Sequence, residues 1–178
     1  MLDQPSKVSL PDALGNRPVV LITGAAGDVG SALVDALSDT YTVVGLDLEG
    51  KEADCELIAI DLTSRDSVWL AMESFRERHG DRIAAVVHLA AYFDFSGEKS
   101  PLYDAVNVDG TRHLLRALQD FQVGQFVYSG TMLVHRPTEP GMRIDESAPI
   151  EPKWAYPESK AAAEEVIRQH HGGIPVVL

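Results

Sequence analysis

Two side chains in the segment 156–160, YPESK, are spaced for acid–base chemistry. Positions i and i+4 share one face of a helix, so Tyr156 and Lys160 would point the same way in a helical segment. A phenol with a pKa near ~10 is a poor base at neutral pH, but a neighbouring ammonium stabilises the phenolate and lowers that pKa. Pro157 is expected to bias Tyr156 away from helical geometry. The pair indicates proton transfer, although out of context such residues are usually exposed surface residues.

Glycines recur every third residue in TGAAGDVG, at Gly24, Gly27 and Gly30, between an apolar run and an amphipathic pattern. Glycine allows the backbone to approach a pyrophosphate whose charge then lies at a helix N-terminus. We therefore predict cofactor contacts from these glycines and from Asp28 and Val29 in the first helical turn. A tight strand-to-helix turn without a ligand is the alternative, but the strand before it and the helix after it favour a dinucleotide site.

Asp47 ends the second apolar run, close to the offset of about 20 residues at which an acid receives the ribose hydroxyls of a dinucleotide. Its carboxylate would repel the 2′-phosphate of NADP, and Lys51 is the only cation nearby. The sequence therefore predicts NAD as the cofactor. A solvated acid at a strand end is the alternative.

Short apolar runs alternate with longer helical patterns along the chain, and these elements must position the site. Strands are predicted at 18–23, 41–47, 56–60, 82–89, 124–129 and 174–178, and helices at 28–38, 64–79, 101–120 and 157–171. Several strands are apolar almost throughout, as expected when helices cover both faces of a parallel sheet. We predict an α/β fold with a doubly wound parallel sheet, a Rossmann fold, with ligands at the carboxyl ends of the strands. Residues 1–17 are expected to form a loose extension and 18–178 one NAD-binding domain.

The composition narrows the possible partners. The 178 residues carry a formal net charge of −12, which would repel a nucleic-acid backbone, and Cys55 is the only cysteine, which fits a reducing compartment. The histidines share no ligand spacing, so we predict no metal site. We find neither a signal peptide nor an apolar run long enough to span a membrane. These features predict a cytoplasmic protein with a small-molecule substrate, no nucleic-acid or membrane partner, and assembly as a homo-oligomer.

Three further signatures complete a resemblance to the extended short-chain dehydrogenase/reductase family, of the NAD-dependent epimerase/dehydratase type. They are Asp61-Leu62-Thr63, His88-Leu89-Ala90-Ala91 and Asn107-Val108-Asp109-Gly110-Thr111. The resemblance implies that Asp61 meets the adenine and that Ala90 and Ala91 line the cofactor cleft, with Leu62 and Leu89 among the cofactor contacts. The alternatives are that Thr63 merely caps the next helix and that Ala90 is ordinary packing.

Asn107 and Gly110 are poor residues for a helix interior, so something else must be gained there. The resemblance implies that Asn107 distorts the helix and helps to hold a water in a proton relay. It also implies that Tyr156 is the acid/base and that Lys160 meets the nicotinamide ribose. Thr131 would donate a hydrogen bond to the substrate oxygen, with Ser129 as the alternative.

The resemblance implies an enzyme that transfers hydride between NAD and an alcohol or ketone carbon, such as that of a nucleotide sugar. A steroid- or flavonoid-type ketone reductase and a regulatory module that binds NAD without turnover are the alternatives. The set of Thr131, Tyr156 and Lys160 favours an enzyme, whereas Met132-Leu133, in place of Asp-Glu, counts against 4,6-dehydration. Family members continue into a C-terminal substrate lobe. The chain is expected to lack that lobe after Leu178, and to bind NAD without appreciable turnover when alone.

Overall fold

A parallel six-stranded sheet in the order β3-β2-β1-β5-β7-β8 forms the centre of the fold. The computed structural model describes residues 17–94, 98–139, 141–145 and 147–178. The strands of this sheet are β1 (Val19–Thr23), β2 (Thr42–Asp47), β3 (Glu56–Ala59), β5 (Ala85–His88), β7 (Phe126–Tyr128) and β8 (Val176–Val177). The helices are α1 (Asp28–Leu37), α2 (Arg65–His79), the π-helix η1 (Tyr103–Gly110), α3 (Thr111–Leu118), the 3-10 helix η2 (Met132–Val134) and α4 (Ala155–His170).

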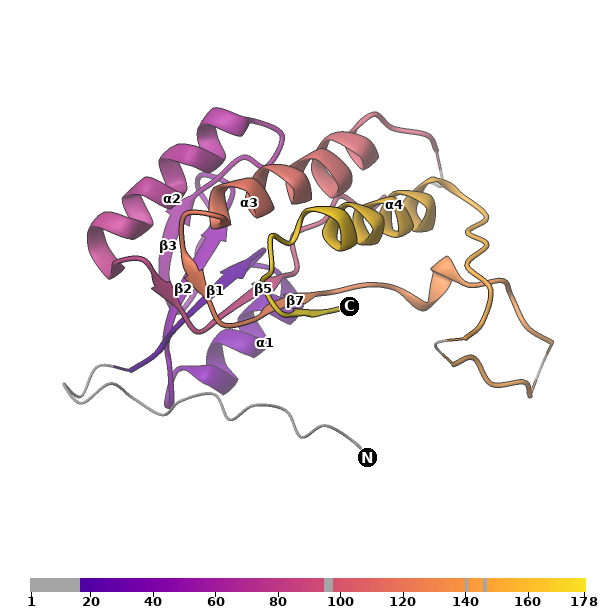
Figure 1. The fold of residues 1–178 in the computed structure, drawn as a ribbon, viewed down its shortest axis with the longest axis horizontal. Helices are drawn as coiled ribbons and strands as arrows, with labels where there is room; N and C mark the ends of the chain where they lie inside the picture. The colour runs from indigo at the N-terminus through magenta and orange to yellow at the C-terminus, as the bar shows by residue number, and fades with distance from the viewer. Residues whose placement is uncertain (1–16, 95–97, 140, 146) are drawn as a thin grey trace.

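Helices cover both faces of the sheet, with α1 on one face and α2, α3 and α4 on the other (Figure 1). The strand residues alternate accordingly. Leu21 of β1 belongs to the core under α2, α3 and α4, whereas its neighbours Val20 and Ile22 pack in a second core with Val34 of α1. The doubly wound α/β fold predicted from the sequence is therefore confirmed.

The strand order reverses at β1, because the chain adds β2 and β3 on one side of it and then crosses to β5 on the other. At such a switch point the loops after neighbouring strands separate and leave a crevice at the carboxyl edge. Gly24 follows β1 and Leu89 follows β5, and both donate backbone hydrogen bonds into this edge, to Leu46 and Thr23 respectively. The glycine-rich turn and the Leu89-Ala90-Ala91 segment thus lie side by side.

At the helix starts, one alternative reading and one expectation were wrong. Ser64, not Thr63, caps α2, since its side chain accepts a hydrogen bond from the Ser67 backbone N–H. Tyr156 is helical, because α4 begins at Ala155 and Pro157 therefore lies in the first turn. Proline is tolerated there because backbone N–H groups of a first turn have no partner within the helix.

The strand predicted at 82–89 is interrupted at Ala84. Its first part, β4 (Arg82–Ile83), pairs with β6 (Gln122–Val123) in a separate two-stranded sheet, and only β5 enters the main sheet. Ala84 donates a backbone hydrogen bond to Val19, and Gly124 packs so closely on Ala84 that a Cβ would lie 2.6 Å from the Ala84 oxygen. These contacts bend the chain between the two short strands.

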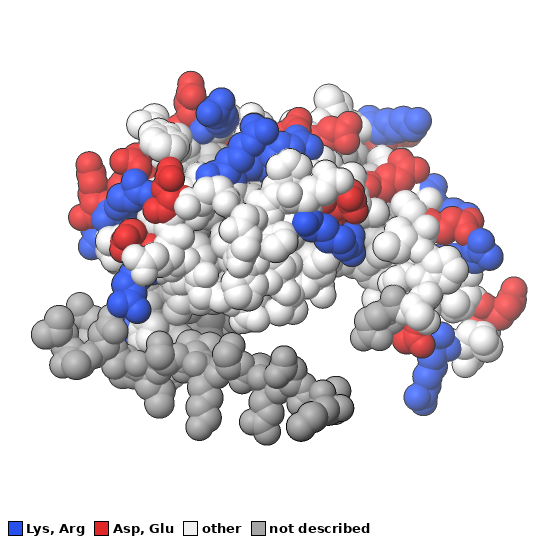
Figure 2. Space-filling model, viewed as in Figure 1, with Lys and Arg blue, Asp and Glu red and all other residues white. Residues whose placement is uncertain are grey.

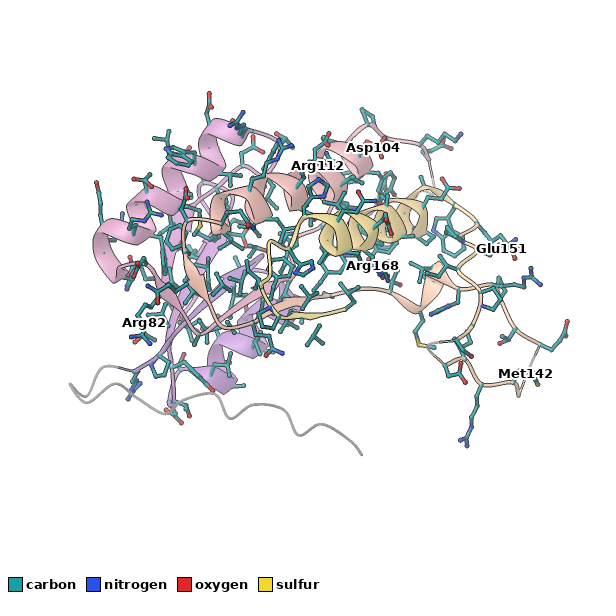
Figure 3. All side chains as sticks on the ribbon, viewed as in Figure 1. Arg82, Asp104, Arg112, Met142, Glu151 and Arg168 are labelled. Atoms are coloured by element: carbon teal, nitrogen blue, oxygen red, sulfur yellow. The ribbon has the colours of Figure 1, made fainter. Side chains whose placement is uncertain are left out.

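Charged side chains of both signs lie over the helices on the face shown in Figure 2, whereas the middle of that face, near β7 and the C-terminus, carries few charges. The segment between η2 and α4, with Met142 and Glu151, extends away from the sheet (Figure 3). Glu151 forms ion pairs with Arg136 and Lys153 in this segment. None of the helices in the described part of the chain is long and apolar enough to cross a membrane. The predicted N-terminal extension, apart from residue 17, lies outside the described residues.

Candidate functional site

Each glycine of the first turn meets a different constraint. Gly24 has a φ of 73°, and a Cβ on it would lie 2.9 Å from the backbone nitrogen of Ala90. A Cβ on Gly30 would lie 2.2 Å from the Gly24 oxygen. Gly27 is exposed, and its nearest neighbour would be the Gly24 oxygen at 3.4 Å. Gly24 and Gly30 are therefore required by the turn itself, whereas Gly27 leaves the start of α1 open to a ligand.

A pocket of about 310 Å³ lies beside this turn, over the carboxyl ends of β1, β2 and β5. Most of the cofactor contacts predicted from the sequence line it: Gly24, Gly27, Asp47, Asp61, Leu62, Leu89, Ala90 and Ala91. The structure places the others outside its wall. Asp28 and Val29 are exposed on the first turn of α1, and Gly30 is buried beneath the turn.

Asp47 connects the end of β2 to the glycine-rich turn. One carboxylate oxygen accepts a hydrogen bond from the Ala26 N–H at 2.9 Å, and the other accepts one from the Leu48 N–H at 2.8 Å. A carboxylate offers about four lone-pair positions, so roughly two remain for a ligand. Lys51 lines the same pocket, which places one cation beside the acid.

At the other wall, Asp61 accepts two hydrogen bonds from Thr63, from its N–H at 2.9 Å and its hydroxyl at 2.7 Å, both through Oδ1. The closeness of η1 to this wall explains Gly110, because a Cβ there would lie 2.8 Å from the Cβ of Leu62. Alanine would be the better helix former, but it would not fit.

Asn107 joins η1 to α4. Its side chain is buried, accepts a hydrogen bond from the Tyr92 N–H at 2.7 Å, and donates to the Tyr92 oxygen at 3.1 Å and to Ser159 Oγ at 2.8 Å. Ser159 Oγ in turn donates to the backbone oxygen of Tyr156 at 2.7 Å. These bonds explain an asparagine in a helix interior. Ser159 was missed by sequence reasoning although it lies within the YPESK segment.

Lys160 is 2% exposed, and its Nζ lies 4.1 Å from the centroid of the Tyr128 ring. Burial lowers the pKa of Lys160 to about 8, and the negative charge of Glu164 opposes this shift. A cation over an aromatic face is stabilised electrostatically. Nothing in the sequence around Tyr128 indicated this contact, because it joins β7 to α4.

Tyr156 is partly buried, with its ring packed edge-on against Phe93 at a centroid distance of 4.6 Å. Burial raises the pKa of its phenol, and Tyr103 adds to the increase. The lowering expected from Lys160 is therefore not found. The phenol therefore keeps its proton at neutral pH in this arrangement.

Thr131 follows β7 and is partly buried, and its hydroxyl oxygen accepts a hydrogen bond from the Leu133 N–H at 3.3 Å, which caps η2. Ser129 is exposed. Both η1 and η2 pack against α4, so the elements that carry Asn107, Thr131 and Tyr156 form one group. None of these three residues, nor Lys160, lines the 310 Å³ pocket, which is formed at the glycine-turn end of the crevice.

Residues 20–177 match the sequence profile of the NAD dependent epimerase/dehydratase family. The chain is 29% identical to an N-acetyl-alpha-D-glucosaminyl-diphospho-ditrans,octacis-undecaprenol 4-epimerase of Escherichia coli over 88% of its own length and 44% of the relative's. It is 31% identical to a 3 beta-hydroxysteroid dehydrogenase/Delta 5-->4-isomerase of Mycobacterium tuberculosis, over 97% of this chain and 47% of that protein. Among solved structures, UDP-glucose 4-epimerase of Thermus thermophilus in complex with NAD superimposes with a TM-score of 0.74 at 30% identity, covering 89% of this chain and 53% of that one. The chain thus spans about half the length of these proteins.

Proposed function

Since this chain belongs to the NAD dependent epimerase/dehydratase family, we propose that it binds NAD in the 310 Å³ pocket and uses Tyr156 in hydride transfer at an alcohol or ketone carbon. One observation carries the proposal. Asn107 of η1 donates a hydrogen bond to Ser159, which donates to the backbone oxygen of Tyr156, so η1 is hydrogen-bonded to the helix turn that bears the phenol. The same element, η1, contributes Val106 to the pocket wall. The pocket and the proton donor are therefore built on the same element.

The residues present fit a dinucleotide. The absent side chain of Gly27 leaves room at the start of α1 for a pyrophosphate, and the carboxylate of Asp47 retains acceptor positions for ribose hydroxyls. Asp61 and Leu62 would contact the adenine, and Ala90 with Ala91 would form the wall toward the nicotinamide. NAD, when bound, supplies the acceptor or donor of hydride.

Proton transfer is assigned to Tyr156. Because burial raises the pKa of its phenol, Tyr156 holds its proton at neutral pH and can give it to a carbonyl oxygen as that carbon is reduced. In the reverse direction a phenolate forms, and the ammonium of Lys160, one turn further along the same helix, would have to turn from the Tyr128 ring toward that oxygen to stabilise it. The hydroxyl of Thr131 would hold the substrate oxygen in place.

For the substrate we propose a secondary alcohol in the sugar part of a nucleotide sugar, as the names of the epimerase relatives suggest. A 3β-hydroxysteroid is the second candidate, because the mycobacterial relative aligns with 97% of this chain. Met132 and Leu133, which occupy the positions of the Asp-Glu pair of 4,6-dehydratases, argue against dehydration. We also propose that the protein is a homo-oligomer, which light scattering would test.

Calorimetric titration with NAD tests the cofactor, and NADH absorbance with UDP-sugars or 3β-hydroxysteroids tests turnover. Because the chain covers half of its relatives, turnover should be measured on the protein in its longest natural form, with Tyr156→Phe as the control. We expect micromolar NAD binding and turnover that depends on Tyr156. NAD binding with no turnover on either substrate class would favour a regulatory module.

A further inference from the structure

His88, at the end of β5, is 1% exposed and uses both ring nitrogens. Its Nδ1 lies 2.6 Å from the hydroxyl oxygen of Thr23 on β1, and its Nε2 lies 3.0 Å from that of Thr111 at the start of α3. The imidazole therefore bridges the sheet to the helix that continues from η1. Neither bond belongs to the proton transfer described above.

The neighbouring bonds determine where the ring carries its proton. The Thr111 hydroxyl donates to the Asn107 backbone oxygen at 2.6 Å, so toward His88 it can only accept. Nε2 is therefore protonated. The Thr23 hydroxyl oxygen accepts the Ala90 N–H at 3.1 Å, which leaves its own proton for Nδ1. A neutral ring protonated on Nε2 satisfies every donor in this chain of bonds.

The surroundings of the ring favour this neutral state. The Phe126 and Tyr128 rings pack against the imidazole, with centroids 5.9 and 5.7 Å away. Burial, followed by the positive charge of Lys160, lowers the pKa of His88 to about 3. A charged imidazole would carry a proton on Nδ1 as well, and that proton would need an acceptor. Its positive charge would also lie near the buried ammonium of Lys160.

We propose that His88 is a positioning residue. Its neutral ring links the Ala90 wall of the cofactor pocket to the backbone of Asn107, and this link keeps the two parts of the site in a fixed position relative to each other. The hydrogen bonds of this linkage run from Ala90 through Thr23, His88 and Thr111 to the backbone oxygen of Asn107. The Asn107 side chain then donates to Ser159, which donates to the backbone oxygen of Tyr156. It rests on the proposed NAD site only at the Ala90 end. An asparagine or leucine at 88 could fill the space but could not bridge the two hydroxyls in this way.

The first test is the tautomer, read in a long-range ¹H–¹⁵N spectrum of the unmodified chain. We expect the Nε2-protonated pattern for His88, unchanged between pH 5 and 8 because its pKa is about 3. A ring protonated on Nδ1, or one that titrates within this range, would overturn the proposal. This measurement does not depend on NAD or on any variant.

The second test compares Thr111→Val, which removes the hydroxyl at nearly constant shape, with Thr111→Ser, which retains it. In the unmodified chain, NAD should shift the Ala90 amide and the Asn107 side-chain amide with one shared affinity. In Thr111→Val the Ala90 shift should persist and the Asn107 shift should shrink, because only the direct bonds of the Asn107 side chain to the Tyr92 backbone then connect it to the pocket wall, and Thr111→Ser should restore the full shift. A full Asn107 response in Thr111→Val would refute the linkage.

Failure of the proposed cofactor site gives a different result, because the Ala90 amide of the unmodified chain would then not respond to NAD at all. The linkage is then judged without the ligand. The Asn107 side-chain resonance must move in Thr111→Val and return in Thr111→Ser, and an unmoved resonance would refute it. A variant that does not fold leaves the tautomer measurement as the deciding result.

Discussion

The strongest prediction concerns Asp47 and the choice between NAD and NADP. Its carboxylate lines the pocket and also holds the turn, because it accepts the N–H groups of Ala26 and Leu48. Replacement by alanine would therefore remove the proposed ligand contact and the structural contacts together. Asp47→Asn removes the negative charge but keeps one of the two backbone bonds, since its single amide oxygen can accept from Ala26 or from Leu48 but not from both.

The expected size follows from the charges involved. A hydrogen bond from a ribose hydroxyl to a carboxylate contributes about 1.5–3 kcal/mol, or roughly 10- to 150-fold in affinity. A 2′-phosphate about 5 Å from the carboxylate would be repelled by about 3 kcal/mol per unit charge at an effective dielectric constant of about 20, and by less where solvent screens the pair. We expect the unmodified chain to prefer NAD by about 100-fold or more.

In Asp47→Asn this preference should fall by at least about tenfold, chiefly because NADP binds better once the repulsion is gone. Lys51, which lines the same pocket, should then attract the 2′-phosphate, so Lys51→Ala should weaken NADP binding and leave NAD binding nearly unchanged. Calorimetric titration with both cofactors, at two salt concentrations, measures these changes. Equal affinities for NAD and NADP in the unmodified chain would show that Asp47 does not read the ribose.

Three further predictions concern activity and stability. Tyr156→Phe should reduce turnover of the longest natural form by about 10²–10⁴-fold while leaving the NAD affinity from calorimetry unchanged; full activity would remove the assignment. Gly24→Ala should lower the urea midpoint more than Gly50→Ala, because both glycines have positive φ but only Gly24 has a backbone atom, Ala90 N, within 3 Å of a new Cβ. Equal midpoints would contradict this. Lys160 has its pKa lowered from 10.5 to about 8, so the folded state binds fewer protons than the unfolded state between these values and stability should rise with pH there. Lys160→Met should abolish this rise in urea titrations at pH 7 and 9.5 and stabilise the chain at pH 7 by up to about 3 kcal/mol.

Much of the fold could be predicted because the signals were local. Apolar runs gave the strands of the main sheet, and the position of Asp47 after the second run placed it in the pocket. The interruption at Ala84 could not be predicted, since it depends on contacts with Val19 and Gly124 that are distant in sequence. The same limit applies to the three glycines. Their spacing indicated a ligand for all of them, whereas the packing shows that Gly30 serves the turn.

The interior of the site was less predictable than its rim. Tyr156 and Lys160 were found from their spacing, but the sign of the tyrosine pKa shift was wrong because burial outweighs a cation that packs on Tyr128 instead. Sequence spacing states which residues share a helix face. It does not state how deeply each is buried, and burial decides the protonation of both groups.

The two buried basic side chains of the site are explained together. Tyr128 lies between them, with Lys160 Nζ 4.1 Å from its ring centroid and the His88 ring centroid 5.7 Å away. Two cations in this apolar layer would repel each other. Among the described residues, Lys160 has a neighbouring acid, Glu164, whose charge favours its protonated form, whereas the charge that acts on His88 is the positive one of Lys160. His88 must therefore be the neutral partner. Hydroxyls at both ring nitrogens allow this. The Thr111 hydroxyl accepts a hydrogen bond from Nε2, and the Thr23 hydroxyl donates one to Nδ1, so the imidazole is fully hydrogen-bonded without a charge. Lys160 can then keep the only positive charge of the pair.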